Sequence, residues 1–304
     1  MKRRYLLCAL IPIIGAMAGC KNNSSKESET STAIYEHILE SNLKYGSDKS
    51  QICKMILKCE PEKIKKKVII APSWEVDMFS SHVDSITHIS GTRKHHCIVN
   101  ELDVNGEKIT HIMTGMGGCS VIDAVMALGC TPCKEILFIG SVGALDENIK
   151  IGDVMIPEYS VCGVGANRYL TSGSLKENDT FGKKYYPNES LYNEILSITN
   201  NEIKDTDISL HIGKTYSVDT ILTQYAHLDE IINMGCNSIE METATLFEAA
   251  EIANIKAVAV FNVSDNTIAN KSLHHDTEGE DSVRRQKGKS EVMPKIALKA
   301  LKVI

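Results

Sequence analysis

Two carboxylates, Glu240 and Glu242, flank Met241 in the segment SIEMETATLFEAA, whose other side chains are mostly apolar or small. A solvated acidic turn is a poor explanation, because Ile239 and residues 244–250 are buried in character. Charged side chains are seldom buried without a partner or a task. We therefore treat the two carboxylates as candidate functional groups.

A run of glycines follows the segment KITHIM, which is expected to be a strand. The run is TGMGGCS, residues 114–120, and it begins with Thr114 and Gly115. Its glycines let the backbone approach a ligand, and the helix that follows offers free N–H groups to an oxyanion. A tight turn would produce the same pattern, so the run needs support from other sites.

Two more clusters supply that support at the ends of apolar segments. The first, GSVGALDENIKIGDV, places Gly140 and Ser141 directly after ILFI. The second, NVSDN, places Ser264 and Asp265 at the end of the strand that contains AVAVF. Ligands of α/β sheets bind at the carboxyl ends of the strands. Three such clusters, together with the paired glutamates, predict a ligand site at that edge.

The elements that must position these clusters alternate between apolar strands and amphipathic helices. This pattern predicts an α/β fold, a three-layer sandwich with a central mixed sheet. HCIVNELDV and KITHIMTG, joined at Asn-Gly, predict a hairpin. The other expected strands are KKKVII, EILFIG, GDVMIP, ISLHIGKTYSV and KAVAVFNVS, and the expected helices span residues 120–129, 189–203, 243–254 and 289–302.

The amino-terminal residues are expected to lie outside this fold. Residues 1–19 combine a basic start with an apolar stretch too short to span a bilayer, and they lead to Cys20. The segment resembles a lipoprotein signal, which implies lipidation of Cys20 and an exported protein anchored to the bacterial cell membrane. An ordinary secretory signal or a short anchor is the alternative. Residues 20–33 predict a flexible tether, and residues 34–66 an N-terminal helical extension.

Net charge and cysteine content bear on whether the protein binds nucleic acid or a metal ion. A net charge of −6 gives no electrostatic case for a nucleic-acid partner. Beyond Cys8 and Cys20, eight cysteines remain, an even number that allows disulfides in an exported protein. Several of them have apolar neighbours, which favours buried thiols. Cys130 and Cys133 have redox spacing but no second pair or nearby His, so no metal site is predicted.

The motifs FIGSVGALDENIKIGDVMIP, SIEMETATLFEAA and VSDN, in this order, resemble the nucleoside phosphorylase and nucleosidase superfamily. That group includes purine nucleoside phosphorylases, uridine phosphorylases and methylthioadenosine/S-adenosylhomocysteine nucleosidases. The resemblance implies that residues 67–304 form a nucleoside phosphorylase-like catalytic domain, in a homo-oligomer. It also implies cleavage of the bond between ribose C1′ and a base nitrogen, without a cofactor.

The resemblance also implies roles for individual residues. Glu242 would accept hydrogen bonds from the ribose hydroxyls, Met241 would pack against the sugar, and Asp265 would be the general acid at purine N7. Glu240 would support its neighbours. The remaining expected substrate-binding residues are Gly140, Ser141, Ser264, Thr114, Gly115 and two base-stacking residues, Tyr216 and Ile221, with Leu222 beside them.

The expected nucleophile depends on where the chain departs from phosphorylases. Their GDP loop with its Arg is replaced by APSWEVDMF, and a second expected Arg is Phe138. Glu75 matches the residue with which nucleosidases position water, while Arg93 would contact phosphate from a neighbouring subunit. Hydrolysis of a purine nucleoside is therefore favoured. The alternatives are phosphorolysis, with inorganic phosphate as co-substrate, and a non-catalytic nucleoside-binding surface lipoprotein.

Overall fold

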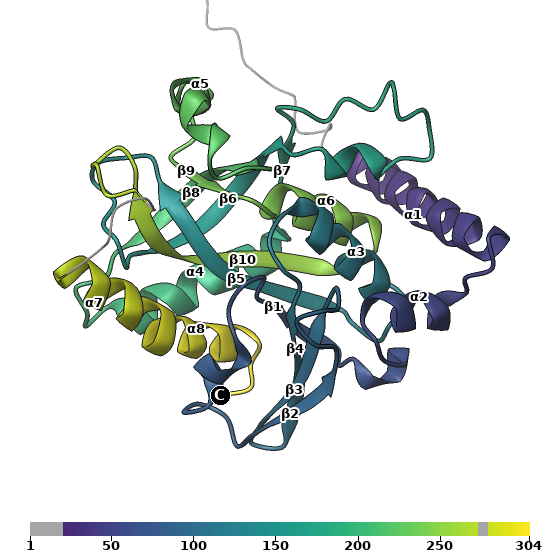
Figure 1. Cartoon of the computed structure of the whole chain (residues 1–304), viewed down its shortest axis with the longest axis horizontal. Coiled ribbons are helices and arrows are strands. Elements are labelled where there is room, and N and C mark those ends of the chain that lie inside the picture. Colours follow the sequence, from purple (N-terminus) through teal and green to yellow (C-terminus); the bar gives the residue numbers. More distant parts are fainter. Residues whose placement is uncertain (1–20, 273–278) are drawn as a thin grey trace, which may run out of the picture.

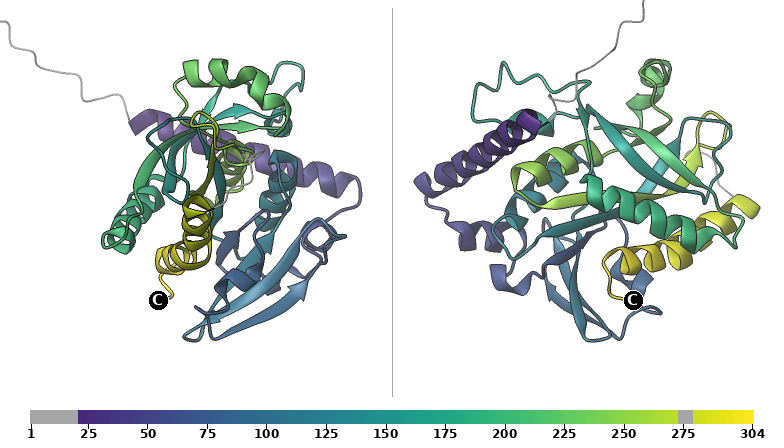
Figure 2. Two further views of the ribbon diagram at one scale, coloured as in Figure 1. Left: turned by 60° about the vertical axis from the view of Figure 1, so that its left-hand side comes forward. Right: turned by 180° about the vertical axis from the view of Figure 1, so that it is seen from behind.

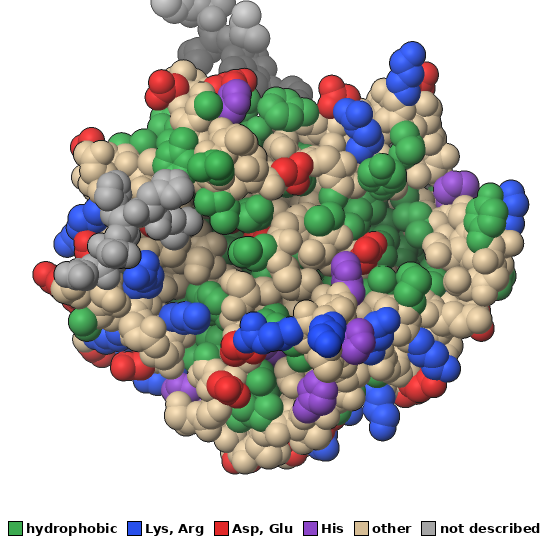
Figure 3. Space-filling model, viewed as in Figure 1, with side chains coloured by type: hydrophobic (Ala, Val, Ile, Leu, Met, Phe, Trp, Pro, Cys, Tyr) green, Lys and Arg blue, Asp and Glu red, His purple; other side chains and the backbone are tan. Residues whose placement is uncertain are grey.

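A computed structural model describes residues 21–272 and 279–304, with side chains described from residue 31 onward in the first range (Figure 1). The predicted signal peptide and Cys20 lie outside the described residues. Within those ranges, no helix combines the length and apolar character needed to cross a membrane. Acidic and basic side chains are interspersed on the face shown in Figure 3.

A ten-stranded mixed sheet forms the centre of the molecule, in the order β10-β6-β8-β9-β5-β1-β4-β3-β2, with β7 paired to β6. The strand β10 pairs with β5 in parallel and with β6 antiparallel, so the path β10-β6-β8-β9-β5 closes on itself. The strands are β1 (Lys67–Ile70), β2 (Ser85–Ser90), β3 (Ile98–Val104), β4 (Glu107–Met113), β5 (Glu135–Ala144), β6 (Val154–Gly163), β7 (Lys184–Tyr185), β8 (Leu210–Val218), β9 (Ser238–Glu240) and β10 (Lys256–Asn266).

Helices cover both faces of the sheet, which confirms the predicted mixed-sheet α/β fold. The helices α2 (Lys49–Ile56), α3 (Gly118–Leu128) and α6 (Thr243–Ile252) pack over one hydrophobic core. The helices α4 (Glu189–Ile203) and α8 (Met293–Ala300) lie side by side over the other (Figure 2). Successive residues of β5 alternate between the two cores, as the period of a strand requires: Phe138 packs on the first side and Leu137 on the second.

The amino-terminal extension differs from its prediction. Residues 21–33, expected as a flexible tether, belong to the helix α1 (Lys21–Lys44), which crosses over α6. Ile34, Tyr35 and Leu39 pack against the first core and anchor this helix. Its segment contains no Gly or Pro to interrupt it, so the helix continues toward the amino terminus.

The local signals for turns and long helices are accurate, whereas short elements differ. The hairpin β3–β4 turns at Asn105 and Gly106, both with positive φ (54° and 81°), and α4 has its predicted bounds. The helix expected over residues 289–302 instead begins as a π-helical turn, Gly288–Val292, before α8. The sequence did not predict two of the helices, α5 (Leu228–Asn233) and α7 (Glu280–Lys287). It also did not predict the strands β2, β7 and β9.

Candidate active site

A cavity of about 190 Å³ lies where the ends of β5, β9 and β10 meet. Strand pairing explains the meeting point, because Gly143 is opposite Asp265 on one side and Ile239 on the other. The cavity collects seven of the predicted site residues: Gly140, Ser141, Ile221, Met241, Glu242, Ser264 and Asp265. Its other lining residues are Pro72, Ser73, Met116, Phe138, Gly143, Val218, Gln224, Ile239 and Glu240.

Glu242 presents a buried carboxylate to this cavity. Its Oε1 accepts a hydrogen bond of 2.6 Å from the backbone N–H of Gly117, at the start of α3. Burial, and then the charge of Glu240, raises the pKa of Glu242 to about 8. The sequence predicted that the N–H groups at the start of α3 would bind a ligand oxyanion. In the structure, the Gly117 N–H binds the carboxyl group of Glu242 instead.

Glu240 lies beside it but is fully engaged by the protein. One oxygen accepts N–H groups of Glu242 (2.7 Å) and Thr243 (2.8 Å), and the other accepts the hydroxyl of Ser217. Burial raises the pKa of Glu240, while these hydrogen bonds act in the opposite direction. Its contacts are those of a residue that fixes the start of α6 and the backbone of Glu242.

Asp265 forms the opposite part of the cavity wall and is 4% exposed. The hydroxyl of Ser264 donates to its Oδ1 at 2.6 Å. Burial raises the pKa of Asp265, and the Ser264 hydrogen bond and the charge of Arg285 oppose that rise. Gly143 leaves room for this carboxyl, because a Cβ there would lie 3.2 Å from Asp265 Oδ2. Asp265 is thus a buried carboxyl at the cavity, held by Ser264 and with a pKa above its usual range.

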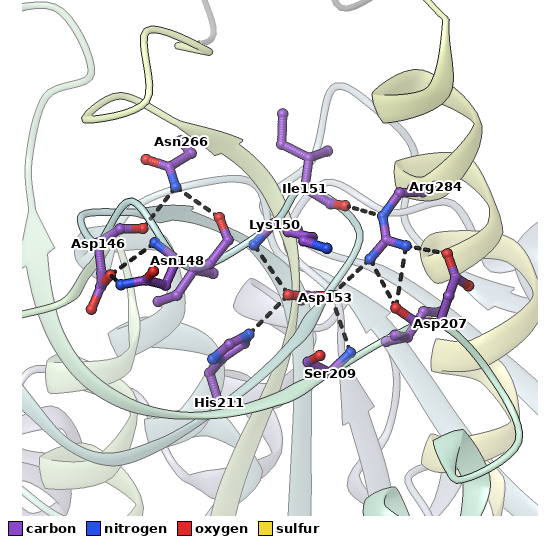
Figure 4. Close-up of polar contacts among 12 residues, drawn as sticks. Asp146, Asn148, Lys150, Ile151, Asp153, Asp207, Ser209, His211, Asn266 and Arg284 are labelled. Carbon is purple, nitrogen blue, oxygen red and sulfur yellow. Dashed lines mark hydrogen bonds and ion pairs between the residues drawn. The ribbon is translucent and has the colours of Figure 1, made fainter.

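A polar network fixes the strand that carries Asp265 (Figure 4). The side-chain amide of Asn266 donates to the carbonyls of Asp146 (2.8 Å) and Ile149 (2.7 Å), which holds the loop after β5 against the end of β10. Nearby, Arg284 of α7 pairs with the buried Asp153 at 2.9 Å. Motif reasoning did not single out these residues, because their partners are distant in sequence.

Arg285 brings α7 to the cavity wall as well. Its guanidinium donates to the backbone carbonyl of Ser264 at 3.3 Å, and the side-chain amide of Asn262 donates to the carbonyl of Arg285 at 3.0 Å. The helix α7 therefore packs directly against the Ser264-Asp265 step. The sequence contained no motif that placed Arg285 here.

Glu75 and Arg93 do not line the cavity. They form an ion pair with each other, with side chains that are 51% and 80% exposed. Glu75 precedes a single 3₁₀ turn, Val76–Phe79, and the backbone just before it brings Pro72 and Ser73 to the cavity instead. The expected position of Glu75 beside an attacking water is therefore not found in this structure.

Four other residues named from the sequence do not line this cavity. Thr114 is buried, and its hydroxyl donates to the carbonyl of Gly115. Gly115 has a φ of +78°, and its N–H donates to Pro72, so it shapes the turn before Met116. Tyr216 is buried in the wall of a second cavity, of about 350 Å³, and Leu222 is 72% exposed.

The remaining residues that line the cavity add aromatic and apolar side chains. Phe138 is in the wall at the position where an Arg was expected, and its ring packs edge-on against Phe261 at 5.8 Å. Among the described residues that line the cavity, none is Lys, Arg or His. Val218, Ile239 and Met116 add apolar surface, so the site combines apolar walls with three carboxyl groups.

Comparisons with known proteins agree with this geometry. The phosphorylase superfamily model matches residues 67–301. A guanosine phosphorylase of Halorubrum lacusprofundi is 25% identical over 210 residues, covering 67% of this chain and 80% of that protein. A DeoD-type purine nucleoside phosphorylase of Bacillus velezensis is 25% identical over 165 residues, covering 54% and 66% respectively.

Solved structures show the same fold. A purine nucleoside phosphorylase from Toxoplasma gondii, in complex with immucillin-H, aligns with a TM-score of 0.65 at 16% identity, covering 81% of this chain and 96% of that one. A uridine phosphorylase from Vibrio fischeri aligns with a TM-score of 0.61 at 19% identity, covering 79% and 91%.

Proposed function

The chain belongs to the phosphorylase superfamily, and on this premise we propose that its cavity binds a purine nucleoside and cleaves the bond between ribose C1′ and the base. It is an enzyme of nucleoside glycosidic bond cleavage. The observation that carries the proposal is the placement of Asp265 and Glu242 in one cavity, both buried and both with a raised pKa.

Each carboxyl suits one half of the reaction. As the C1′–N bond breaks, its electron pair moves to the base, and a proton from Asp265 on the base neutralises the leaving group. Positive charge develops on the ribose ring, where the carboxylate of Glu242 accepts hydrogen bonds from the ribose hydroxyls and stabilises it. In this proposal, Met241 packs against the ribose.

The Ser264-Asp265 pair supports a purine rather than a pyrimidine as the base. A purine offers N7 as a proton acceptor, and a pyrimidine has no such atom. Ile221, Val218 and Ile239 supply apolar surface for a planar ring. The names of the two curated relatives, a guanosine and a purine nucleoside phosphorylase, support the same class.

Separate observations support water and phosphate as the nucleophile. The relatives are named phosphorylases, which favours phosphorolysis with inorganic phosphate as co-substrate. The cavity of one protomer favours water, because a phosphate dianion needs charge-assisted hydrogen bonds and the described residues that line the cavity include three carboxyl groups and no Lys, Arg or His. Of the two, we propose hydrolysis, with phosphorolysis as the second candidate. Because Glu75 lies outside the cavity, it gives hydrolysis no support. The case for hydrolysis depends on the charges of the residues that line the cavity.

We expect base release from purine nucleosides to proceed in phosphate-free buffer. Added phosphate should change the rate by less than about twofold, since an uncharged nucleophile needs no cationic clamp. Adenosine, inosine, guanosine and methylthioadenosine are incubated with and without phosphate, and free ribose and ribose 1-phosphate are quantified. Sulfate at equal ionic strength is the control for salt.

Accumulation of ribose 1-phosphate, or loss of activity without phosphate, would establish the phosphorolytic alternative. Binding of these nucleosides without base release under either condition would support the third alternative, a non-catalytic binding protein.

We also propose that the protein is a homo-oligomer anchored to the cell membrane by lipid at Cys20. The lipoprotein-like signal supports the anchor, because buried acyl chains contribute about 0.8 kcal/mol per CH₂ to membrane binding. Wild-type protein should enter the detergent phase of a Triton X-114 extract, whereas Cys20→Ala should stay in the aqueous phase. Cys8→Ala, in the same segment, is the matched control. Unchanged partitioning of Cys20→Ala would indicate a plain hydrophobic anchor.

A further inference from the structure

Three elements meet at the end of α3, where the amino-terminal extension contacts the catalytic domain. Tyr35 of α1 donates its hydroxyl to the carbonyl of Met126 at 2.8 Å and lies 3.4 Å from the sulfur of Cys130. The thiol of Cys53, on α2, donates to the carbonyl of Ala127 at 3.6 Å, and the backbone N–H of Cys130 donates to the same carbonyl at 3.0 Å. Two cysteines from distant parts of the chain therefore converge on one peptide group.

Both thiols therefore lie beside the last turn of α3, and each affects the pKa of the other. Packing holds them there: Gly129 touches the ring of Tyr35 so closely that a Cβ would be 2.2 Å from its hydroxyl oxygen. Cys53 is fully buried, whereas Cys130 is partly exposed. Cys133, which has redox spacing with Cys130, is buried and directs its thiol to the carbonyl of Glu135 at 3.8 Å.

We propose that Cys53 and Cys130 form a disulfide that joins α2 to the end of α3 when a low-molecular-weight disulfide such as oxidised glutathione is present. The Cys130 thiolate attacks one sulfur of glutathione disulfide, which forms a mixed disulfide and releases one glutathione thiolate. The Cys53 thiol then loses its proton and attacks Cys130 Sγ, which breaks the mixed disulfide. Two protein thiols are oxidised, and one glutathione disulfide is reduced to two glutathione molecules.

The surroundings assign the two cysteines different parts in this exchange. The neighbouring Cys53 thiol lowers the pKa of Cys130, helped by the Tyr35 hydroxyl and the charge of Lys49, while burial opposes the shift. The neighbouring Cys130 sulfur and burial raise the pKa of Cys53. The accessible cysteine is thus the attacking thiolate, and the buried one completes the bond from inside the protein.

The bond would close a long loop, residues 53–130, between the extension and the domain. A disulfide across a loop of this size removes conformational freedom from the unfolded chain. We expect the Tm of the oxidised protein to exceed that of the reduced protein by about 5–10 °C.

Peptide mapping tests the proposal directly on the full-length protein. The protein is equilibrated with oxidised and reduced glutathione, alkylated, digested with trypsin without reduction, and analysed by mass spectrometry. Trypsin releases Cys53 in residues 50–54, SQICK, in which it is the only cysteine. We expect this peptide linked to residues 109–134, with fragmentation assigning the bond to Cys130 rather than Cys119 or Cys133.

Two variants sharpen the test. In Cys53→Ser the link should be lost and glutathione should stay attached to Cys130, because the resolving thiol is missing. Cys133→Ser is the matched control, and the Cys53 link should form in it as in wild type. Full alkylation of Cys53 under oxidising conditions, or a bond of Cys130 to Cys133, would overturn the proposal. None of these outcomes depends on the reaction catalysed.

Discussion

Asp265→Asn is expected to lower kcat/KM for purine nucleosides by about a hundredfold or more, because the amide has no proton to give to the leaving base. The substitution keeps the size of the side chain and the hydrogen bond from Ser264 to its oxygen. The free energy of unfolding should therefore change little. Initial rates of base release, followed in parallel with thermal unfolding, give both quantities.

The control for this variant is Asp205→Asn, which makes the same change at an exposed position away from the cavity. Its kinetics should match those of the wild type. Full activity of Asp265→Asn would remove Asp265 from the mechanism. Comparable losses in activity and in stability would instead indicate a structural carboxyl.

Glu242→Gln should lower kcat/KM by about a hundredfold, with effects on both kcat and KM. A Gln carbonyl still accepts the Gly117 N–H, so the start of α3 keeps its partner. The neutral amide, however, cannot balance the positive charge that builds on the ribose ring in the transition state. The loss should therefore exceed what weaker sugar binding alone would produce.

The pH profile distinguishes this role from simple packing. Because the pKa of Glu242 is about 8 in the free protein, its carboxyl is protonated at lower pH and ionised above that value. The kcat/KM of the wild type should rise as the pH approaches 8, and this rise should be absent in Glu242→Gln. Glu177→Gln, at an exposed loop position, is the control and should keep it. A rise of the same size in Glu242→Gln would assign the titration to another group.

The strands and their carboxyl ends were predictable because each has a local signal. An apolar run that ends in Gly-Ser or Ser-Asp identifies both a buried strand and the polar group at its end. Six of the seven predicted residues that line the cavity belong to such a strand end or to the Glu-Met-Glu step, and Ile221 is the exception. The type I′ turn at Asn105 and Gly106 is a similarly local signal. These features depend on only a few neighbouring residues.

The errors arise where distant contacts decide the outcome. The closing of β10 against both β5 and β6 depends on pairing between residues far apart, and no pattern within one strand reports it. Glu75 was assigned by its resemblance to the residue with which nucleosidases position water, but its side chain pairs with Arg93 beside the 3₁₀ turn Val76–Phe79. On β8, Val218 lines both cavities, whereas Tyr216, two residues earlier on the same face, lines the second cavity and not the candidate site.

The positions of the lining residues suggest how the substrate range of such a protein can change over evolution. The carboxyl groups are held by strands and by the first turn of α6, where one altered backbone position would disturb several hydrogen bonds at once. Ile221 and Gln224 instead lie outside the sheet, on the connection between β8 and α5, where Gln224 belongs to the 3₁₀ turn Thr223–His227. Substitutions there can reshape the wall that faces the base while leaving the bond-breaking groups in place. Drift in base preference is thus separable from loss of catalysis, so related proteins can diverge in substrate long before they lose activity.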